Sequence, residues 1–355
     1  MDKKITGRQG CRLCPRNCGT KVSSSGIGMC GVPGNLMVAR AALHFWEEPC
    51  ISGTRGSGAV FFSGCSMHCV YCQNGNISGN LINEPEIASD GTVKGIAGKV
   101  ITGERLSEIF WELREKGANN INLVTPDQYL PDVAWAVRKV RDEGFDLPFL
   151  MNCSGYEKVE VLKIMEGLID IYLPDFKYMD PELAERYSNA SDYPEVAKAA
   201  IAEMVRQCPV QEFSPEEKFV KKEVDISGET VENRNSCTSD EKEEASVLIR
   251  KGVIVRNLLL PGNVMNSKEI VKYLYNTYGD SITLSLMSQY TPMPGIEKNY
   301  PELGRRVRIS EYERLVDFAI KIGVTNAFIQ DREVAKDSFI PSFDCEGVEN
   351  SLSSR

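Results

Sequence analysis

Six short apolar runs recur along the chain, and they constrain its fold more than any other feature. They lie at residues 59–64, 120–125, 147–153, 169–176, 253–262 and 282–290. Most are continuously apolar, as in parallel strands whose sheet is covered on both faces. The amphipathic segments between them have a helical period and lie at residues 106–117, 130–144, 156–167 and 194–207. This alternation predicts an α/β fold, either a β/α barrel or a doubly wound sheet.

Polar residues gather where the apolar runs end. In chain order they are Cys65, Thr125, Asn152, Ser154, Asp175, Lys177 and Gln289. In parallel β/α folds the carboxyl ends of the strands meet on one face, and active sites are built there. We therefore expect these side chains to line a common site.

Two segments interrupt the alternation. Residues 79–104 are rich in glycine, and residues 211–247 are polar and charged with few large apolar side chains. Because a structureless stretch of this length is unusual inside a compact domain, we expect the second to be a surface insertion or mobile loop. The predicted organisation is a Cys-rich segment at residues 1–50, a barrel at residues 51–335 and a tail at residues 336–355.

The charge balance bears on the partners of the protein. The 355 residues include 41 Lys and Arg against 50 Asp and Glu, a formal net charge of -9. A nucleic-acid-binding protein normally presents a basic face, so no nucleic-acid partner is expected. No apolar run approaches the ~18 residues that a membrane span needs, and the polar N-terminal stretch is unlike a signal peptide. We therefore expect a cytoplasmic protein with no membrane partner.

The twelve cysteines are unevenly distributed along the chain. A disulfide framework is typical of short exported chains, whereas clustered thiols in a reducing compartment more often bind metal. Seven of the twelve form two groups, which are Cys11, Cys14, Cys18 and Cys30, and then Cys65, Cys69 and Cys72. Both groups are therefore candidate metal sites.

The second group has the spacing Cys-x3-Cys-x2-Cys. A structural zinc site takes four ligands, and His68 would have to point at the same small ion as its neighbour Cys69. Three thiolates on a loop suit a 4Fe-4S cluster better, because they hold three irons and leave the fourth open to a ligand. Zinc closed by His68 or by a distant residue is the alternative.

The stretch GCSMHCVYCQN, residues 64–74, resembles the cluster motif of the radical S-adenosylmethionine enzymes. The resemblance implies that Cys65, Cys69 and Cys72 ligate three irons of a 4Fe-4S cluster, and that S-adenosyl-L-methionine chelates the fourth. The reduced cluster would cleave this cofactor to methionine and a 5'-deoxyadenosyl radical, which abstracts hydrogen from a substrate. His68 would then be a bystander.

Further blocks, including NLVTP, NCSGY, DFK and VRNLLLPG, resemble the pyruvate formate-lyase activating enzyme-like subfamily from Cys11 to about Asp331. The resemblance implies a partial (β/α)6 barrel with a small Cys-rich N-terminal segment. It also implies an oxidoreductase that acts on a glycine of a partner protein. An electron donor such as flavodoxin or ferredoxin would reduce the cluster.

The resemblance implies that the cofactor-binding residues are Thr125, Asn152, Ser154, Asp175, Lys177 and Gln289. Lys177 would reach the cofactor carboxylate, a task that suits a flexible ammonium group. Thr125 stands where relatives carry a Gly-Gly-Glu-Pro element, and Asn257 stands where close relatives carry a histidine, so this chain departs from the pattern at both positions. An ion pair at a strand end is the alternative role for Asp175 and Lys177.

The N-terminal group offers four thiols at close spacing, which can fill a tetrahedral zinc site or hold a second iron-sulfur cluster. Two alternatives to glycine activation stay open. The chain could abstract hydrogen from a small molecule or another protein residue, or it could be a non-catalytic iron-sulfur or zinc protein that retains the fold. Cleavage of S-adenosylmethionine separates the enzymes from the non-catalytic protein.

Overall fold

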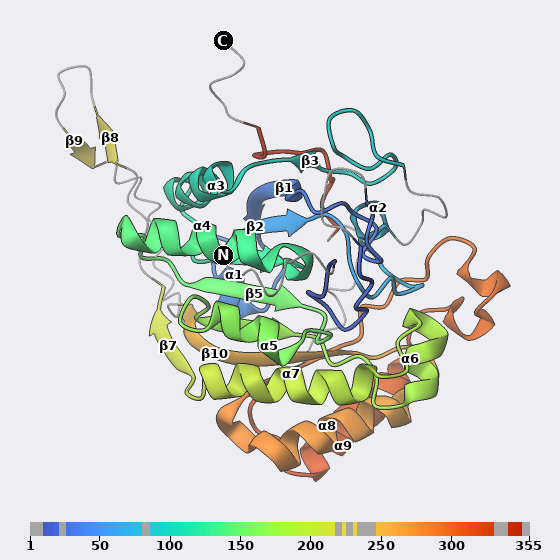
Figure 1. The fold of residues 1–355 in the computed structure, drawn as a ribbon. Coiled ribbons are helices and arrows are strands. Elements are labelled where there is room, and N and C mark those ends of the chain that lie inside the picture. Colours follow the sequence, from blue (N-terminus) through green and yellow to red (C-terminus); the bar gives the residue numbers. More distant parts are fainter. Residues whose placement is uncertain are drawn as a thin grey trace.

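A sheet of parallel strands forms the centre of the molecule, whose computed structural model is drawn in Figure 1. The structure describes residues 10–20, 26–79, 86–216, 246–329 and 340–349, and the backbone of residues 222–224 and 230–232. The parallel strands of this described part are β2 (Ser57–Phe62), β4 (Ile121–Val124), β5 (Phe149–Cys153), β6 (Ile171–Pro174), β10 (Val247–Leu258), β11 (Thr283–Met287) and β12 (Ala327–Ile329).

These strands lie side by side in chain order, and across the described residues the two ends of the sheet do not pair with each other. Sequential parallel strands that do not close are the arrangement of a partial β/α barrel. The predicted fold class is therefore confirmed. Each of the six predicted runs overlaps one strand, although β2 and β10 begin before the predicted runs, and every residue of β2 is buried, as expected for a sheet covered on both faces. The short strand β12 was not predicted.

An antiparallel edge precedes the parallel strands and was also not predicted. Strand β1 (Met37–His44) pairs with β2 on one side and with β3 (Lys99–Val100) on the other. The tail continues this edge, because the Cys345 amide donates to the Ala39 carbonyl at 3.0 Å and the Ala41 amide donates to the Glu346 carbonyl at 2.8 Å. Both the Cys-rich segment and the tail are thus joined to the sheet.

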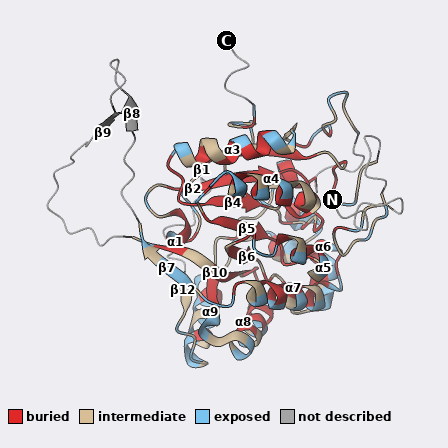
Figure 2. Cartoon of the chain, turned by 60° about the vertical axis from the view of Figure 1, so that its left-hand side comes forward, coloured by how far each residue is buried: buried red, intermediate tan, exposed pale blue. Residues whose placement is uncertain are grey.

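The helices described in the structure pack along the strands (Figure 1), with their buried faces toward the sheet (Figure 2). They are α1 (Pro49–Ser52), α2 (Gly75–Ser78), α3 (Gly103–Glu115), α4 (Leu130–Asp142), α5 (Val159–Leu162), α6 (Pro181–Ser188), α7 (Tyr193–Gln207), α8 (Val264–Tyr278) and α9 (Ile309–Lys321). Three of the predicted helical segments form α3, α4 and α7. Thr102 is the N-cap of helix α3, and its hydroxyl accepts a hydrogen bond from the Arg105 amide at 3.2 Å.

The predicted helix at residues 156–167 is wrong in extent. The structure has only the four-residue helix α5 there, followed by a 3-10 turn at Lys163–Met165. The Ser154 hydroxyl donates to the Glu157 carboxylate at 3.0 Å and accepts the Tyr156 amide at 3.2 Å. Such local hydrogen bonds compete with the helical pattern, so the turn after β5 persists and the helix starts late.

The insertion predicted at residues 211–247 is described only in part. Strand β7 (Glu212–Pro215) pairs antiparallel with β10, and β8 (Lys222–Val224) pairs with β9 (Thr230–Glu232). The remaining positions, including most of the expected mobile loop, lie outside the described residues.

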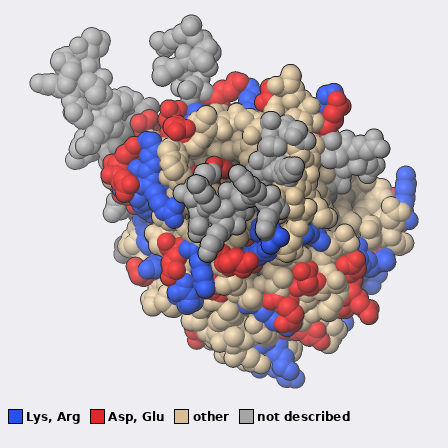
Figure 3. All heavy atoms as spheres, in the orientation of Figure 1, with Lys and Arg blue, Asp and Glu red and all other residues tan. Residues whose placement is uncertain are grey.

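Acidic and basic side chains are interspersed on the molecular face drawn in Figure 3. None of the helices in the described part of the chain is long and apolar enough to cross a bilayer.

Gly155 lies in the turn between β5 and α5, and its backbone conformation contributes to the stability of the fold. Its φ of +77° favours glycine, and a Cβ atom there would overlap the carbonyl oxygen of Asp175. We expect Gly155→Ala to lower the free energy of unfolding by about 3 kcal/mol or more, because strain and overlap add. Gly167 has a similar φ of +76° but no atom within 4 Å of the added Cβ.

Gly167→Ala is therefore the matched control, and it should cost about 1 kcal/mol from backbone strain alone. Urea denaturation of both variants measures the difference. Equal costs would contradict the assigned overlap with Asp175.

Candidate active site

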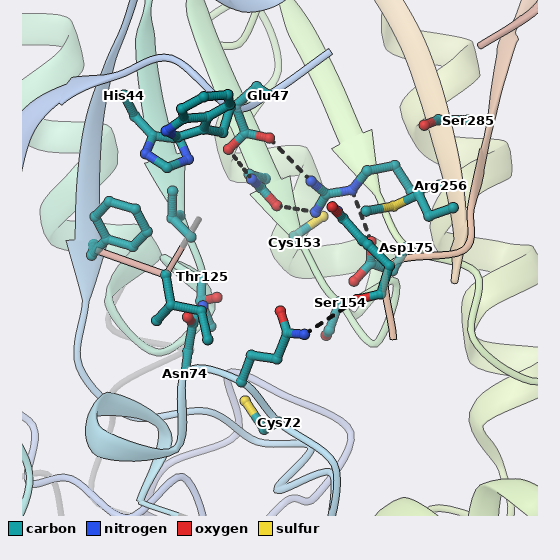
Figure 4. Close-up of a pocket in the computed structure, with 18 of the residues that line it drawn as sticks. His44, Glu47, Cys72, Asn74, Thr125, Cys153, Ser154, Asp175, Arg256 and Ser285 are labelled. Carbon is teal, nitrogen blue, oxygen red and sulfur yellow. Dashed lines mark hydrogen bonds and ion pairs between the residues drawn. The ribbon is translucent and has the colours of Figure 1, made fainter. Parts of the chain in front are cut away.

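A cavity of about 620 Å³ opens at the carboxyl ends of the parallel strands, and its size is typical of small-molecule sites. The structure brings all the predicted cluster and cofactor residues to its wall: Cys65, Cys69, Cys72, Thr125, Asn152, Ser154, Asp175, Lys177 and Gln289. Figure 4 shows Arg256 across the cavity from Cys72 and Thr125. The sequence therefore identified one continuous site, while the cofactor contacts stay predictions.

The three thiols lie on the loop that follows β2. This loop approaches the Cys-rich segment closely, since the Cys65 amide donates to the Cys30 carbonyl at 3.0 Å. A Cβ at Gly64 would lie 2.9 Å from the same carbonyl oxygen and 2.6 Å from the side chain of Val32. The glycine before the first cysteine is thus required by packing as well as by its φ of +89°.

Burial changes the protonation of these thiols. Burial and the nearby Cys69 raise the pKa of Cys72 to about 11, and burial also raises the pKa of Cys65 well above its ordinary value. Such thiols stay protonated at neutral pH unless a metal stabilises the thiolate. The Met67 amide donates to Cys65 Sγ at 3.5 Å, and the Asn74 amide interacts with Cys72.

Within the described residues, no three His, Cys, Asp or Glu side chains converge at the spacing that one metal ion needs. Thiolates around a single zinc would lie about 3.8 Å apart. His68, predicted to be a bystander, also lines the cavity, and burial lowers the pKa of its imidazole. Its Nε2 atom is buried with no hydrogen-bond partner in the described part of the chain.

Arg256 is the main site residue that the sequence analysis missed. It extends from β10, and its guanidinium donates to Asp175 Oδ1 at 2.9 Å and to the Asn152 side chain, and it forms an ion pair with Glu47 at 3.2 Å. Figure 4 shows the guanidinium between these groups. The neighbouring Asn257 does not line the cavity, and its side-chain amide donates to the Phe176 carbonyl at 2.9 Å.

Glu47 and Glu48 also belong to the site, although no sequence signal distinguished them from surface acids. Glu47 accepts hydrogen bonds from Asn122 at 3.0 Å and Asn152 at 3.3 Å. Glu48 is buried, and this burial, partly opposed by Arg256, raises the pKa of its carboxyl group. The cavity wall therefore carries groups of both charges.

Asp175 and Lys177 form an ion pair on the cavity wall rather than on the open surface, where their side chains are 26% and 18% exposed. Burial opposes the ammonium charge, but Asp175 and Cys69 together raise the pKa of Lys177 above its ordinary value. Lys177 thus remains protonated beside the cysteine loop.

Thr125 adopts the left-handed conformation, with a φ of +56°. A β-branched residue there is strained by about 1–3 kcal/mol, and strain of this kind is concentrated at functional sites. The Thr125 amide donates to the Asn152 carbonyl at 2.8 Å, which holds the turn against β5.

Large apolar side chains surround the mouth of the cavity. Phe45, Trp46, Ile329 and Ile340 line it while remaining between 42% and 56% exposed. Exposed apolar side chains gathered beside a pocket are typical of an interaction surface.

The N-terminal thiols form a second neighbourhood beside the first. Each of Cys11, Cys14, Cys18 and Cys30 lies close enough to interact electrostatically with the others. Each sulfur also interacts with the backbone amide two residues later, at Leu13, Arg16, Thr20 and Val32. Burial raises the pKa of Cys14 to about 11 and that of Cys30 to about 12.

Replacing Arg256 tests the electrostatics of the site. Burial favours protonation of Asp175, but Arg256 and Lys177 outweigh it and lower the pKa of this carboxyl group. Arg256→Met should lower the free energy of unfolding by about 3–5 kcal/mol at pH 7, because buried carboxylates lose their partner. The stabilisation from a lowered carboxyl pKa is present above the unfolded value of about 3.9 and is lost as the pH falls through the lower folded value. The cost of Arg256→Met should therefore shrink as the pH falls below about 4, and the variant and the wild type should converge.

Denaturation at several pH values measures this convergence, with Arg314→Met on the exposed face of α9 as the control. A cost that is independent of pH would contradict the assigned charge network.

No family model matches the chain. An uncharacterised protein of Methanocaldococcus jannaschii, MJ0674, is 23% identical over 311 residues, which are 88% of this chain and 74% of that protein. Among solved structures, Streptococcus suis SuiB bound to S-adenosylmethionine matches with a TM-score of 0.43 and 10% identity, over 79% of this chain and 51% of SuiB. SuiB bound to the precursor peptide SuiA has a TM-score of 0.39 and 9% identity, over 70% of this chain and 48% of SuiB. The chain thus spans about half the length of these solved structures, and a likeness of this degree carries no argument about ligands or activity.

Proposed function

We propose that the chain is a radical S-adenosylmethionine enzyme with a 4Fe-4S cluster at Cys65, Cys69 and Cys72. The observation that carries this proposal is the meeting of three cysteine thiols, of which Cys69 is buried and the other two partly buried, with a wall of mixed charge at one cavity. When bound and reduced, the cluster and S-adenosylmethionine together supply one-electron chemistry that removes a hydrogen atom from a substrate. The chain itself binds, orients and shields these groups.

The thiol set fits an iron-sulfur cluster better than a single ion. Three cysteines leave one iron open, and amide hydrogen bonds to the sulfurs are typical of such sites. The orphaned Nε2 atom of His68 supports a ligand beside this loop.

The opposite wall suits a zwitterionic ligand such as the methionine part of S-adenosylmethionine. Lys177 and Arg256 offer cations for a carboxylate, and Glu47, Glu48 and Asp175 offer acceptors for ammonium and hydroxyl groups. The strained backbone at Thr125 supports a close approach by the ligand, as in the related sequence pattern. The cofactor roles of Asn152, Ser154 and Gln289 remain part of this proposal.

The exposed apolar mouth supports a protein or peptide as the substrate. Phe45, Trp46, Ile329 and Ile340 would contact an apolar segment beside the reacting residue. By analogy with the activating enzymes, we propose a glycine of a partner protein as the target and flavodoxin or ferredoxin as the electron donor. A small molecule or another protein residue is the alternative substrate.

We further propose that Cys11, Cys14, Cys18 and Cys30 hold a second metal, either zinc or an iron-sulfur cluster. The electrostatic interactions among the four sulfurs and the amide beside each of them support this assignment. Because the described thiols do not lie at the spacing of a single ion, zinc would have to draw them together on binding. Amide groups directed at sulfur stabilise the thiolates that ligate metals.

Anaerobic reconstitution with iron and sulfide, followed by dithionite and S-adenosylmethionine, tests the main proposal. The wild type should release 5'-deoxyadenosine and methionine, and Cys69→Ala should release neither, because one iron ligand is lost. Cys208→Ala is the matched control, since Cys208 is buried outside the cavity and its thiol contacts the Ile169 carbonyl. Liquid chromatography measures both products.

A wild type that binds iron and sulfide but cleaves no cofactor would reject the enzyme and favour a non-catalytic iron-sulfur protein. Equal product from Cys69→Ala would reject the assigned ligands.

Metal analysis tests the second site. Cys14→Ser should lose the metal of the N-terminal group while retaining the absorption of the reconstituted cluster at Cys65, Cys69 and Cys72. Cys345→Ser, which changes a thiol outside both groups, should lose neither. Zinc loss and iron loss distinguish the two kinds of site, and unchanged metal content in Cys14→Ser would contradict a second metal.

A further inference from the structure

A buried hydroxyl group contacts one of the proposed cluster ligands. Ser188, the last residue of α6, donates from Oγ to Cys69 Sγ at 3.1 Å. Both residues are buried, so water does not compete for this hydrogen bond. The Met67 amide donates to Cys65 Sγ, and Cys72 interacts with the Asn74 amide and the Ser78 side chain. Ser188 supplies a side-chain donor to Cys69.

Two tyrosines extend the contact into a chain of hydroxyl groups. The Tyr178 hydroxyl lies 2.8 Å from Ser188 Oγ and 2.7 Å from the Tyr71 hydroxyl. A thiolate can only accept, so Ser188 must donate to Cys69, Tyr178 to Ser188 and Tyr71 to Tyr178. All three hydroxyl groups therefore donate in the direction of the sulfur. Hydrogen bonds aligned in this way strengthen one another.

Backbone contacts hold the donor in place. The Val70 amide donates to the Tyr187 carbonyl at 2.9 Å, which joins the cysteine loop to the end of α6. Arg16, from the Cys-rich segment, donates to the Ser66 carbonyl at 2.9 Å and to the Ser188 carbonyl at 2.7 Å. These contacts fix the end of α6 against the cysteine loop, and Ser188 itself is not among the residues that line the cavity.

We propose that Ser188, oriented by Tyr178 and Tyr71, is a positioning residue that raises the reduction potential of the cluster. This inference rests on the cluster proposed above. Reduction adds one electron from the donor to the cluster, with no bond or proton transferred, and so places more negative charge on the sulfurs. A hydrogen bond to Cys69 is stronger in the reduced state, and it therefore favours reduction.

The test is an EPR-monitored redox titration of the reconstituted full chain without S-adenosylmethionine. Ser188→Ala should shift the midpoint potential downward, so that at one fixed potential the ratio of reduced to oxidised cluster falls on the order of threefold. Tyr178→Phe should shift it less, because Ser188 keeps its hydroxyl but loses its orienting donor. Ser188→Thr retains a hydroxyl and should restore the potential.

Tyr187→Phe is the matched control. The Tyr187 ring packs beside Tyr71, with 6.3 Å between the ring centroids. Its hydroxyl donates to Glu302 and takes no part in the hydrogen bonds that lead to Cys69. It should leave the potential unchanged.

A wild-type potential in Ser188→Ala with an intact cluster signal would overturn this inference and leave the proposed function standing. Equal shifts in Ser188→Ala and Tyr187→Phe would also overturn it, since they would reflect packing alone. No 4Fe-4S signal in any reconstituted protein would overturn the proposed function and this inference together.

Discussion

The guanidinium of Arg256 holds together side chains from separate parts of the chain: Glu47 after β1, Asn152 on β5 and Asp175 after β6. Carboxylates taken out of water become protonated or destabilise the fold when no cation lies beside them, so the arginine allows Glu47 and Asp175 to meet here in their charged forms. A buried ion pair of this kind adds little net stability, because desolvation offsets most of the attraction. Its value here lies in fixing one arrangement of charges on the cavity wall.

The two cysteine groups belong to one structural unit rather than to independent modules. The Cys65 amide binds the Cys30 carbonyl, and Arg16 binds carbonyl groups of both the cysteine loop and the end of α6. Loss of order in the N-terminal segment would therefore disturb the loop after β2. This coupling gives the Cys-rich segment a structural part in the site, whichever metal it holds.

Much of the fold was predictable because its signals are local. Buried parallel strands read as apolar runs, and helix α3 has a capping threonine at its start. The prediction was wrong at residues 156–167, where a hydrogen bond between Ser154 and Glu157 displaces the first turns of a helix. Strand β1 was not predicted, because its position beside β2 depends on pairing between distant residues, which no local sequence pattern encodes.

The sequence by itself determined the alternation of strands and helices, and the spacing of Cys65, Cys69 and Cys72. It also placed Asp175 and Lys177 at a strand end, because these features depend on neighbours within a few residues. Only the tertiary structure decided that Arg256 faces Glu47, 209 positions away, and that Ser188 donates to Cys69, 119 positions away. Such contacts arise when the sheet and helices pack, and the exclusion of water then makes each buried polar group depend on a distant partner.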